Sequence, residues 1–295
     1  MGLFDNYNAP ENRGVLRTPH EKRGIFKFFE IYGRHAWKLM ELNLLYFLFC
    51  VPLFAMLVLL LESGEVVWIA LAIPSVIVGP ATAAMTKVAR NFSQERPAFV
   101  LHDFFDAFKK NMNQGLVMGT IDVVFILGFI VGIPVYKQLA AQNSMMYVPY
   151  VICLSCMLIF VMMHFFIYQL ICSTNLSMGK ILKNSLLLVT VGIKNTLWTL
   201  LVLLVVLGMC YLLLPLSALL IPFWPLTFVA VVACFNCYPL IRKYVIQPYY
   251  DQRGEENPEF AYLKGEDGEE ALFEDRSAEE TPVKEQKKKK KKTIS

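Results

Sequence analysis

The sequence has few charged residues, and they are scarcest in its first 246 positions. Only 18% of the 295 residues are charged and 56% are apolar, against about 45–50% apolar residues in ordinary soluble domains. More than half of the 24 acidic residues follow residue 247, so the first 246 residues are poorer still in charge. The net charge of +4 is too small to indicate a nucleic-acid-binding protein. The composition excludes a typical soluble enzyme and predicts a membrane domain followed by a polar tail.

The sequence also lacks the motifs of common enzyme classes. It contains no glycine-rich phosphate loop, no H-E-x-x-H and no G-x-S-x-G. Its seven cysteines lie in or beside apolar runs, where a thiol behaves as a small hydrophobic group. Two pairs, Cys153/Cys156 and Cys234/Cys237, have C-x-x-C spacing without other metal ligands nearby in the sequence. We therefore expect no catalytic residues, no metal site and no cofactor, and active transport would need a partner or an ion gradient.

Six apolar stretches are long enough, or nearly so, to cross a bilayer as helices, which needs about 20 residues each. They are Leu42–Leu61, Val66–Thr86, Leu116–Tyr136, Tyr147–Cys172, Leu197–Pro215 and Ser217–Ile241. The predicted fold is all-α: a polytopic, six-helix transmembrane bundle with interfacial helices. Its expected parts are a cytoplasmic N-terminus with an interfacial helix (residues 1–41), a membrane domain (42–246) and a disordered charged tail (247–295).

Lysine and arginine are sorted between the predicted loops. If the N-terminus is cytoplasmic, the inner segments carry 27 of the 28 basic residues and the outer segments carry only Lys137. Cytoplasmic loops are enriched in Lys and Arg, so we predict that both termini are cytoplasmic. The outer loops are too short to fold into a domain. We expect recognition to occur within the bilayer or from the cytoplasm.

Three of the inner segments have amphipathic patterns. Aromatic residues alternate with charges from Ile25 to Glu41, which predicts an interfacial helix leading into the first span. Phe99–Gln114 and Ser177–Asn195 also combine apolar stripes with charges. Each segment could simply position the next span, or it could form a docking surface for a cytoplasmic partner. The partner-docking candidates are Asp103, Phe104, Phe105, Phe108, Lys109 and Lys110.

Ionisable residues inside the spans are costly and are candidate functional sites. Asp122 lies about six residues into the third span and His164 about eight residues into the fourth, counted from the cytoplasmic ends. At 1.5 Å per residue both lie about 9–12 Å deep on adjacent antiparallel helices. We predict that Asp122 faces His164 or a water pocket between them, with Asn236 and Gln169 as candidate members of the group. The group could be a hydrogen bond that locks the bundle, or a proton relay or ligand site.

Proline and glycine interrupt the second span. Proline removes a backbone donor and crowds the preceding turn, so Pro74 and then Gly79 and Pro80 predict a kink or a break that frees carbonyls near Ile77 and Val78. Broken helices can form substrate sites in transporters. The small residues after Pro80 also let helices pack closely, and we favour this second interpretation.

Three blocks of sequence resemble the YesL-like family of bacterial integral membrane proteins, long catalogued as a domain of unknown function. They are Leu42–Tyr46 leading to Val51-Pro52, then Gly79–Met85, then Asp103–Asn111. Genes of such proteins typically lie beside carbohydrate-uptake genes, often next to sugar ABC permeases, and no catalytic residues are assigned in the family. The resemblance implies an accessory role in ABC-type carbohydrate uptake in a bacterial plasma membrane, with a permease or ATPase as the partner.

Two other functions stay open at this point. The chain could be a small secondary permease that uses the polar pair between the third and fourth spans. It could also be a membrane scaffold whose tail recruits a cytoplasmic protein. The tail is acidic and then ends in Lys287–Lys292, features that are not part of the family pattern. Such charge blocks do not form a core, and the lysines could attract anionic lipid at about 1 kcal/mol each or be neutralised by the acidic stretch.

Overall fold

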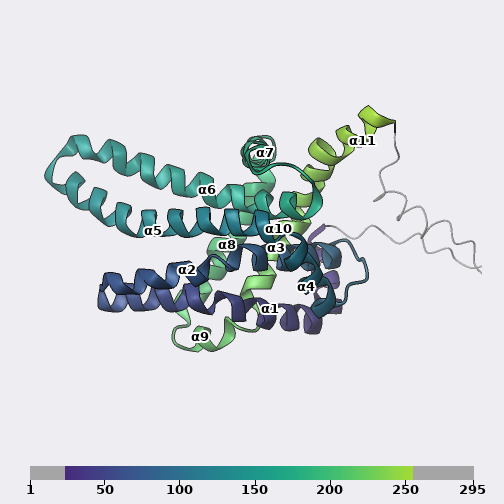
Figure 1. Ribbon diagram of the computed structural model, residues 1–295, viewed down its shortest axis with the longest axis horizontal. Coiled ribbons are helices and arrows are strands. Elements are labelled where there is room, and N and C mark those ends of the chain that lie inside the picture. Colours follow the sequence, from purple (N-terminus) through teal and green to yellow (C-terminus); the bar gives the residue numbers. More distant parts are fainter. Residues whose placement is uncertain (1–23, 255–295) are drawn as a thin grey trace, which may run out of the picture. The chain divides into compact units, whose positions relative to one another are not determined.

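The computed structural model describes residues 24–254, and within that range every regular element is helical and no strand occurs (Figure 1). Expectations for residues 1–23 and 255–295, including the terminal lysines, lie outside the described residues. The chain divides into two units at Ile246 and Gln247. The elements of the first unit are α1 (Gly24–Ser63), η3 (Val66–Leu71), α2 (Ala72–Ser75), α3 (Val78–Ser93), α4 (Val100–Lys110), α5 (Met112–Gln142), η4 (Ser144–Met146), α6 (Tyr147–Ser173), α7 (Met178–Val191), α8 (Ile193–Leu212), α9 (Leu216–Leu220), α10 (Pro225–Ile241) and the π-helical turn η5 (Arg242–Ile246).

Five helical stretches of the described residues are long and apolar enough to cross a membrane: Gly24–Ser63, Met112–Gln142, Ser144–Ser173, Ile193–Leu212 and Pro225–Arg253. A sixth candidate is the bent pair Val66–Ser75 and Val78–Ser93, whose two parts meet at 45°. The chain is therefore an all-α protein with five such helices among residues 24–254, or six if the bent pair is one span. This count agrees with the expected multi-pass membrane protein.

Helix α1 is continuous over 40 residues. At 1.5 Å per residue it is about 60 Å long, whereas the hydrocarbon core of a bilayer is about 30 Å thick. The expected interfacial segment and the first span form one helix without a break, because no glycine or proline lies between Gly33 and Pro52. Residues on both sides of the expected boundary, such as Leu39 and Leu42, pack into the same core.

The sixth predicted span is not one helix. Helix α9 ends at Leu220 and α10 begins at Pro225, so the expected helix from Ser217 to Ile241 is interrupted. Proline lacks an N–H and ends a helix that it would otherwise enter, but its fixed φ fits the first helical position. Pro222 and Pro225 thus explain the break and the new start.

A buried asparagine of α1 fixes the beginning of α10. Asn43 is fully buried, and its amide Nδ2 donates to the Ile221 carbonyl at 2.8 Å. Its Oδ1 accepts the backbone N–H of Thr227 at 2.8 Å. The first N–H groups of a helix have no partner within the helix, so Asn43 caps α10 from a neighbouring helix.

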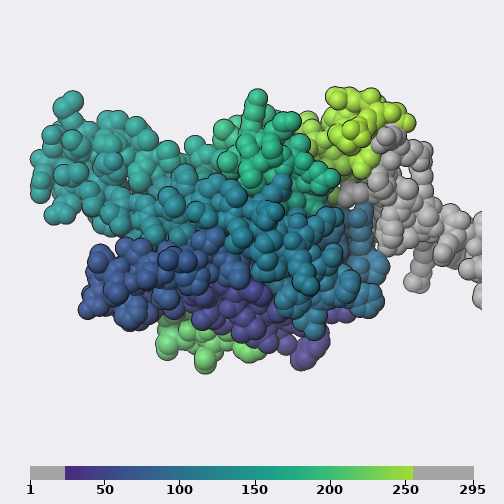
Figure 2. All heavy atoms as spheres, in the orientation of Figure 1, coloured from purple at the N-terminus to yellow at the C-terminus, as the bar shows by residue number. Residues whose placement is uncertain are grey.

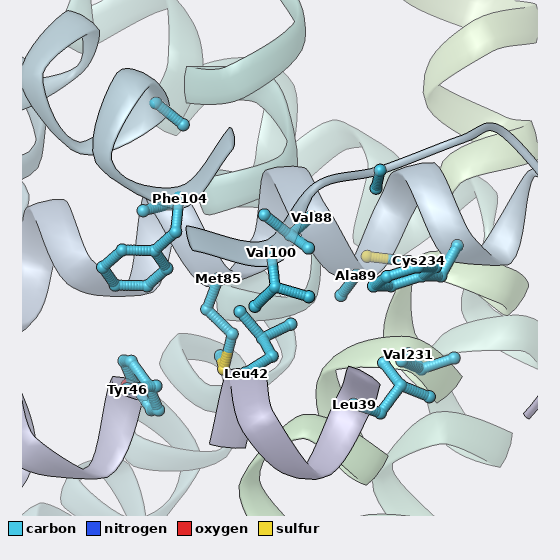
Figure 3. Packing of buried hydrophobic residues seen from close by; sticks show 14 of the residues in the cluster. Leu39, Leu42, Tyr46, Met85, Val88, Ala89, Val100, Phe104, Val231 and Cys234 are labelled. Carbon is cyan, nitrogen blue, oxygen red and sulfur yellow. The ribbon is translucent and has the colours of Figure 1, made fainter. Parts of the chain in front are cut away.

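Helix α3 is at the centre of the first unit and packs against α1, α4, α5, α6 and α10. Four of its alanines are buried, which lets neighbouring backbones approach closely: Ala81, Ala83, Ala84 and Ala89. Figure 3 shows Leu42 of α1, Met85 of α3 and Val100 of α4 facing one another in one of the two buried clusters. This packing places the helices that form the candidate site.

Two tertiary contacts join the ends of successive helices. Arg34 near the start of α1 forms an ion pair with Glu95, just after α3, with Nη1 and Oε1 3.1 Å apart. Gln114 at the start of α5 donates to the carbonyl of Leu176, just after α6, at 2.9 Å. The start of α1 therefore lies beside the end of α3, and the start of α5 lies beside the end of α6.

The described part of the second unit is helix α11 (Gln247–Arg253). The expected disordered tail is therefore wrong for these residues. Two contacts between side chains four residues apart stabilise the helix: Gln247 Nε2 donates to Asp251 Oδ1 at 2.7 Å, and the Arg253 guanidinium lies 4.3 Å from the centre of the Tyr249 ring.

Candidate functional site

Asp122 of α5 and His164 of α6 are in direct contact. The Nε2 atom of His164 lies 2.8 Å from Asp122 Oδ1. The predicted pairing of the two residues is confirmed, because equal depths on neighbouring antiparallel helices bring them to the same level. Both side chains are largely buried in the part of the chain that the structure describes.

The His164 ring is held from its other side. Its Nδ1 atom lies 2.9 Å from the Phe160 carbonyl, which can only accept. Nδ1 therefore carries a hydrogen and donates it. The Phe160 ring contacts His164 edge to face, with ring centres 4.5 Å apart, and stacks on Phe125 of α5 at 4.2 Å. These contacts fix the orientation in which Nε2 points at Asp122.

Tyr168 completes the group, and the sequence reasoning missed it. Its hydroxyl donates to Asp122 Oδ2, so each carboxylate oxygen has one partner, His164 for one and Tyr168 for the other. Tyr168 follows His164 by four residues, which places both on one face of α6. The His-x-x-x-Tyr spacing, one turn apart beside an intramembrane Asp, was the available signal.

These three residues line a cavity of about 530 Å³, within the range of about 300–1,000 Å³ that is typical of ligand sites. The cavity runs from the polar group toward the end of α1 and the turn between α5 and α6, and its lining includes Leu61 and Ile130. Most of the lining is apolar. The other lining side chains with a polar group are Tyr46, Ser75 and Thr82.

A second cavity of about 180 Å³ lies between α3, α6 and α10. Thr82, His164, Phe165 and Tyr168 line both cavities. These side chains therefore form the partition between the two spaces: His164 and Tyr168 line both cavities, and Asp122 lines the larger one.

Gln169 and Asn236 do not join the group. Gln169 is buried and donates through Nε2 to the Ala233 carbonyl of α10 at 3.1 Å. Asn236 donates to Thr199 Oγ1 at 3.3 Å, at the α8–α10 interface. Their expected place beside Asp122 is wrong, because their helix positions turn them toward α10 and α8.

The predicted break of the second span is confirmed. The helix bends by 45° between Ser75 and Val78, after Pro74 and next to Gly79 and Pro80. The expectation of free carbonyls at the break is wrong, because the Ile77 carbonyl accepts the Ala81 N–H at 3.3 Å and the Val78 carbonyl accepts the Thr82 hydroxyl at 2.7 Å.

Glycines bring the bent helix against α5. A Cβ atom added to Gly79 would lie 2.0 Å from the Gly115 carbonyl oxygen, and one added to Gly119 would lie 2.3 Å from the Val76 carbonyl oxygen. Only glycine fits this crossing, which supports the interpretation of close packing. Gly119 precedes Asp122 by one turn, so the crossing also sets the position of the carboxylate. Gly79 and Gly119 are part of the cavity wall.

The docking candidates on α4 divide into two groups. Phe104 and Phe108 are buried, and their rings lie 5.7 and 5.2 Å from the Phe49 ring of α1. Their assignment as docking residues is corrected, because the amphipathic face of α4 packs inward on α1 and α3. Asp103 Oδ2 accepts the backbone N–H of Phe99 at 3.0 Å and so stabilises the start of α4. The side chains of Phe105, Lys109 and Lys110 are exposed.

The cysteines of the described range are all unpaired, and no group of three or more His, Cys, Asp or Glu side chains gathers there in a metal-binding arrangement. The thiols of Cys172 and Cys234 contact the backbone of α3, at Ala83 and Thr86. These two residues contribute to helix packing.

The sequence profile of a family described as "Protein of unknown function, DUF624" matches residues 39–133. The chain is similar to this family over α1 from Leu39, the broken second span, α4 and most of α5. The match includes Asp122 and the glycine crossing but ends before His164 and Tyr168. The three blocks that resemble the YesL-like family lie within it. No curated protein matches the chain, and no solved structure matches it.

Proposed function

We propose that the chain is a non-enzymatic, multi-pass protein of a bacterial plasma membrane, with cytoplasmic termini, and that it acts as a small permease with a ligand site inside the bilayer. The observation that carries the proposal is the Asp122 carboxylate in the wall of the larger cavity, held between His164 and Tyr168, which line both cavities. Ionisable groups among membrane-spanning helices are expensive and mark transport and proton pathways.

The hydrogen bonds require one proton between Asp122 and His164. Because Nδ1 of His164 donates to the Phe160 carbonyl, Nε2 either carries a second proton or accepts one from Asp122. In both states the pair is neutral as a whole. Loss of that proton would leave a carboxylate facing a nitrogen lone pair, so the link between α5 and α6 would break. This gives the helices two arrangements that differ by one proton, which a permease driven by an ion gradient needs.

The groups that face this pair come from the helices around it. Tyr168 lies on α6 itself, Tyr46 of α1 lines the larger cavity, and Cys234 of α10 lines the smaller one. α3 contributes Thr82, which does not titrate in the physiological range. The proton thus belongs to Asp122 and His164, and their neighbours act by hydrogen bonding.

A growth experiment in cells tests the permease proposal. Asp122→Asn and His164→Ala each remove the shared proton, and both variants should reproduce the uptake defect of a gene deletion across a panel of carbon sources. Thr120→Val is the matched control, since Thr120 is exposed on the same helix and donates only within it. Wild-type uptake by both site variants, at equal protein levels in the membrane, would overturn the proposal.

The second candidate is an accessory protein of ABC-type carbohydrate uptake that contacts a permease or ATPase from the cytoplasm. The observation that favours it is the exposed outer face of α4, with Phe105, Lys109 and Lys110. A sugar would find few polar partners in the larger cavity, where each unpaired hydroxyl is costly. A role in carbohydrate uptake therefore fits contact with a partner better than a sugar site in this chain.

Affinity purification in mild detergent tests the accessory function. A tagged wild-type chain should co-purify an ABC permease or ATPase, and the triple variant Phe105→Ala, Lys109→Ala, Lys110→Ala should lose it. The permease variants at Asp122 and His164 should retain the partner. Equal recovery of the partner by the triple variant would contradict docking through α4.

A further inference from the structure

We propose that the larger cavity binds a neutral lipid whose headgroup is a hydroxyl, such as a long-chain primary alcohol. This inference deepens the proposed function, because it names the ligand class of the same cavity. It depends on three properties of the site: the apolar walls, their continuity with the lipid-facing surface, and the hydrogen-bonding state of the polar end.

The walls fit a hydrocarbon chain. α1 contributes Leu57 and Leu61, α5 contributes Ile126 and Phe129, and α6 contributes Met157. No lysine or arginine of the described residues lines the cavity. Burial of polar groups against such walls is unfavourable. An alkyl chain that moves from the bilayer into the cavity exchanges one apolar environment for another, so its transfer has no such free-energy cost.

The cavity borders the surface that faces the hydrocarbon. Residues next to the lining are exposed and apolar on all three helices, including Val58 of α1, Val124 and Val131 of α5, and Leu158 of α6. Figure 2 shows the α5–α6 hairpin (teal) and the region of α1 and α2 (blue) diverging at the left of the view. A chain can therefore enter sideways from the bilayer, between α1 and the hairpin.

The hydroxyl groups at the polar end already use their hydrogens. The Thr82 hydroxyl donates to the Val78 carbonyl at 2.7 Å, so in the 2.8 Å contact between Tyr46 and Thr82 the donor is Tyr46. The Ser75 hydroxyl donates to the Leu71 carbonyl at 2.6 Å. The oxygens of these residues keep lone pairs and can only accept from a ligand.

The hydrogens of Tyr168 and His164 are also already used. Tyr168 donates to Asp122, and His164 uses Nδ1 for the Phe160 carbonyl and Nε2 for Asp122. The cavity thus offers acceptors and no spare donor. A carboxylate or a fully ionised phosphate headgroup, which accepts only, would be unpaired, and a hydroxyl, which donates, would be paired.

An ammonium headgroup also donates hydrogen bonds, but its charge makes it a poorer ligand for this site than a hydroxyl. Asp122 and His164 share one proton and are neutral together, so the site holds no net negative charge for a cation. Transfer of an ammonium group into it would cost its hydration without an ion pair in return. A neutral hydroxyl has no such cost.

Photo-crosslinking of the purified full-length protein in nanodiscs tests the inference. The probe is a long-chain primary alcohol with a diazirine in its chain, compared with the carboxylic acid, alkyl phosphate and alkylammonium probes of equal chain length. The alcohol should label peptides of α1, α5 and α6 several-fold more than the other probes, and excess unlabelled alcohol should compete. Ile126→Trp, which fills the cavity, should abolish labelling, and Tyr46→Phe should weaken binding about two- to tenfold.

The outcomes separate the ligand class from the site. Stronger labelling of the same peptides by the acid, phosphate or ammonium probe would overturn the hydroxyl lipid and keep the cavity as the site. Absence of labelling of these peptides by every probe in the wild type would overturn the inference, whether or not the Ile126→Trp variant folds. If Asp122→Asn and His164→Ala grow like the wild type while the alcohol still labels, the permease function fails and the lipid site stands.

Discussion

Asn43 Oδ1 accepts the backbone N–H of Thr227 at 2.8 Å, although the two residues lie 184 positions apart in the sequence. This bond joins the first helix of the described chain to the start of the last helix of the bundle. It is fully buried, so its loss leaves an unpaired donor in an apolar surrounding.

We expect Asn43→Leu to lower stability by about 1–3 kcal/mol, the cost of a buried polar group without a partner. Thermal unfolding in detergent, followed by tryptophan fluorescence, measures the change. Asn195→Leu is the control, because Asn195 makes one bond at the exposed end of α8. Equal destabilisation by the two variants would contradict the capping role.

Gly119→Ala should destabilise the protein by about 1–3 kcal/mol, because the new Cβ meets backbone rather than a side chain that can move. Gly128→Ala lies in the same helix with nothing within 4 Å of the added atom. It should be neutral or stabilising by up to about 1 kcal/mol from helix propensity. A neutral Gly119→Ala would show that α3 and α5 are farther apart than described.

Tyr168→Phe removes one of the two bonds to Asp122 and should lower stability by about 1 kcal/mol. Tyr147→Phe is the control, since Tyr147 is exposed in the first turn of α6. Equal unfolding temperatures for Tyr168→Phe and the wild type would argue that the carboxylate does not depend on the hydroxyl.

Phe104→Ala should cost about 3–5 kcal/mol, because the ring is fully buried between α1 and α4. Phe105→Ala should leave stability nearly unchanged, since the Phe105 side chain is 42% exposed. Detergent unfolding of the two variants compares the two faces of α4. Strong destabilisation by Phe105→Ala would show that the outer face also packs within the protein.

The contact of Asp122 with His164 could be predicted because it needs only the rise per residue and the alternation of spans. Tyr46 could not be chosen in advance, since aromatic residues fill most of the apolar stretches. Tyr168 was missed although it follows His164 by four residues, a spacing that places both on one face of the helix. Asn43 was equally hidden, because its partners follow after residue 220. The continuity of α1 was missed because the charges around Arg34 and Lys38 indicate an interface, yet charge alone does not end a helix.

The bend in the second span has a further consequence for any change of shape. Thr82 and Gly79 lie in cavity walls, and the same rigid helix continues to Ser93, close to the ion pair of Arg34 with Glu95. A ligand that pushes on α3 at Gly79 and Thr82 would therefore tilt the whole helix. The tilt would move the far end of α3, which lies beside α4. The bend lies at Val76 and Ile77, so a small rotation there would move both the cavity wall at the start of α3 and the end of α3 at Ser93.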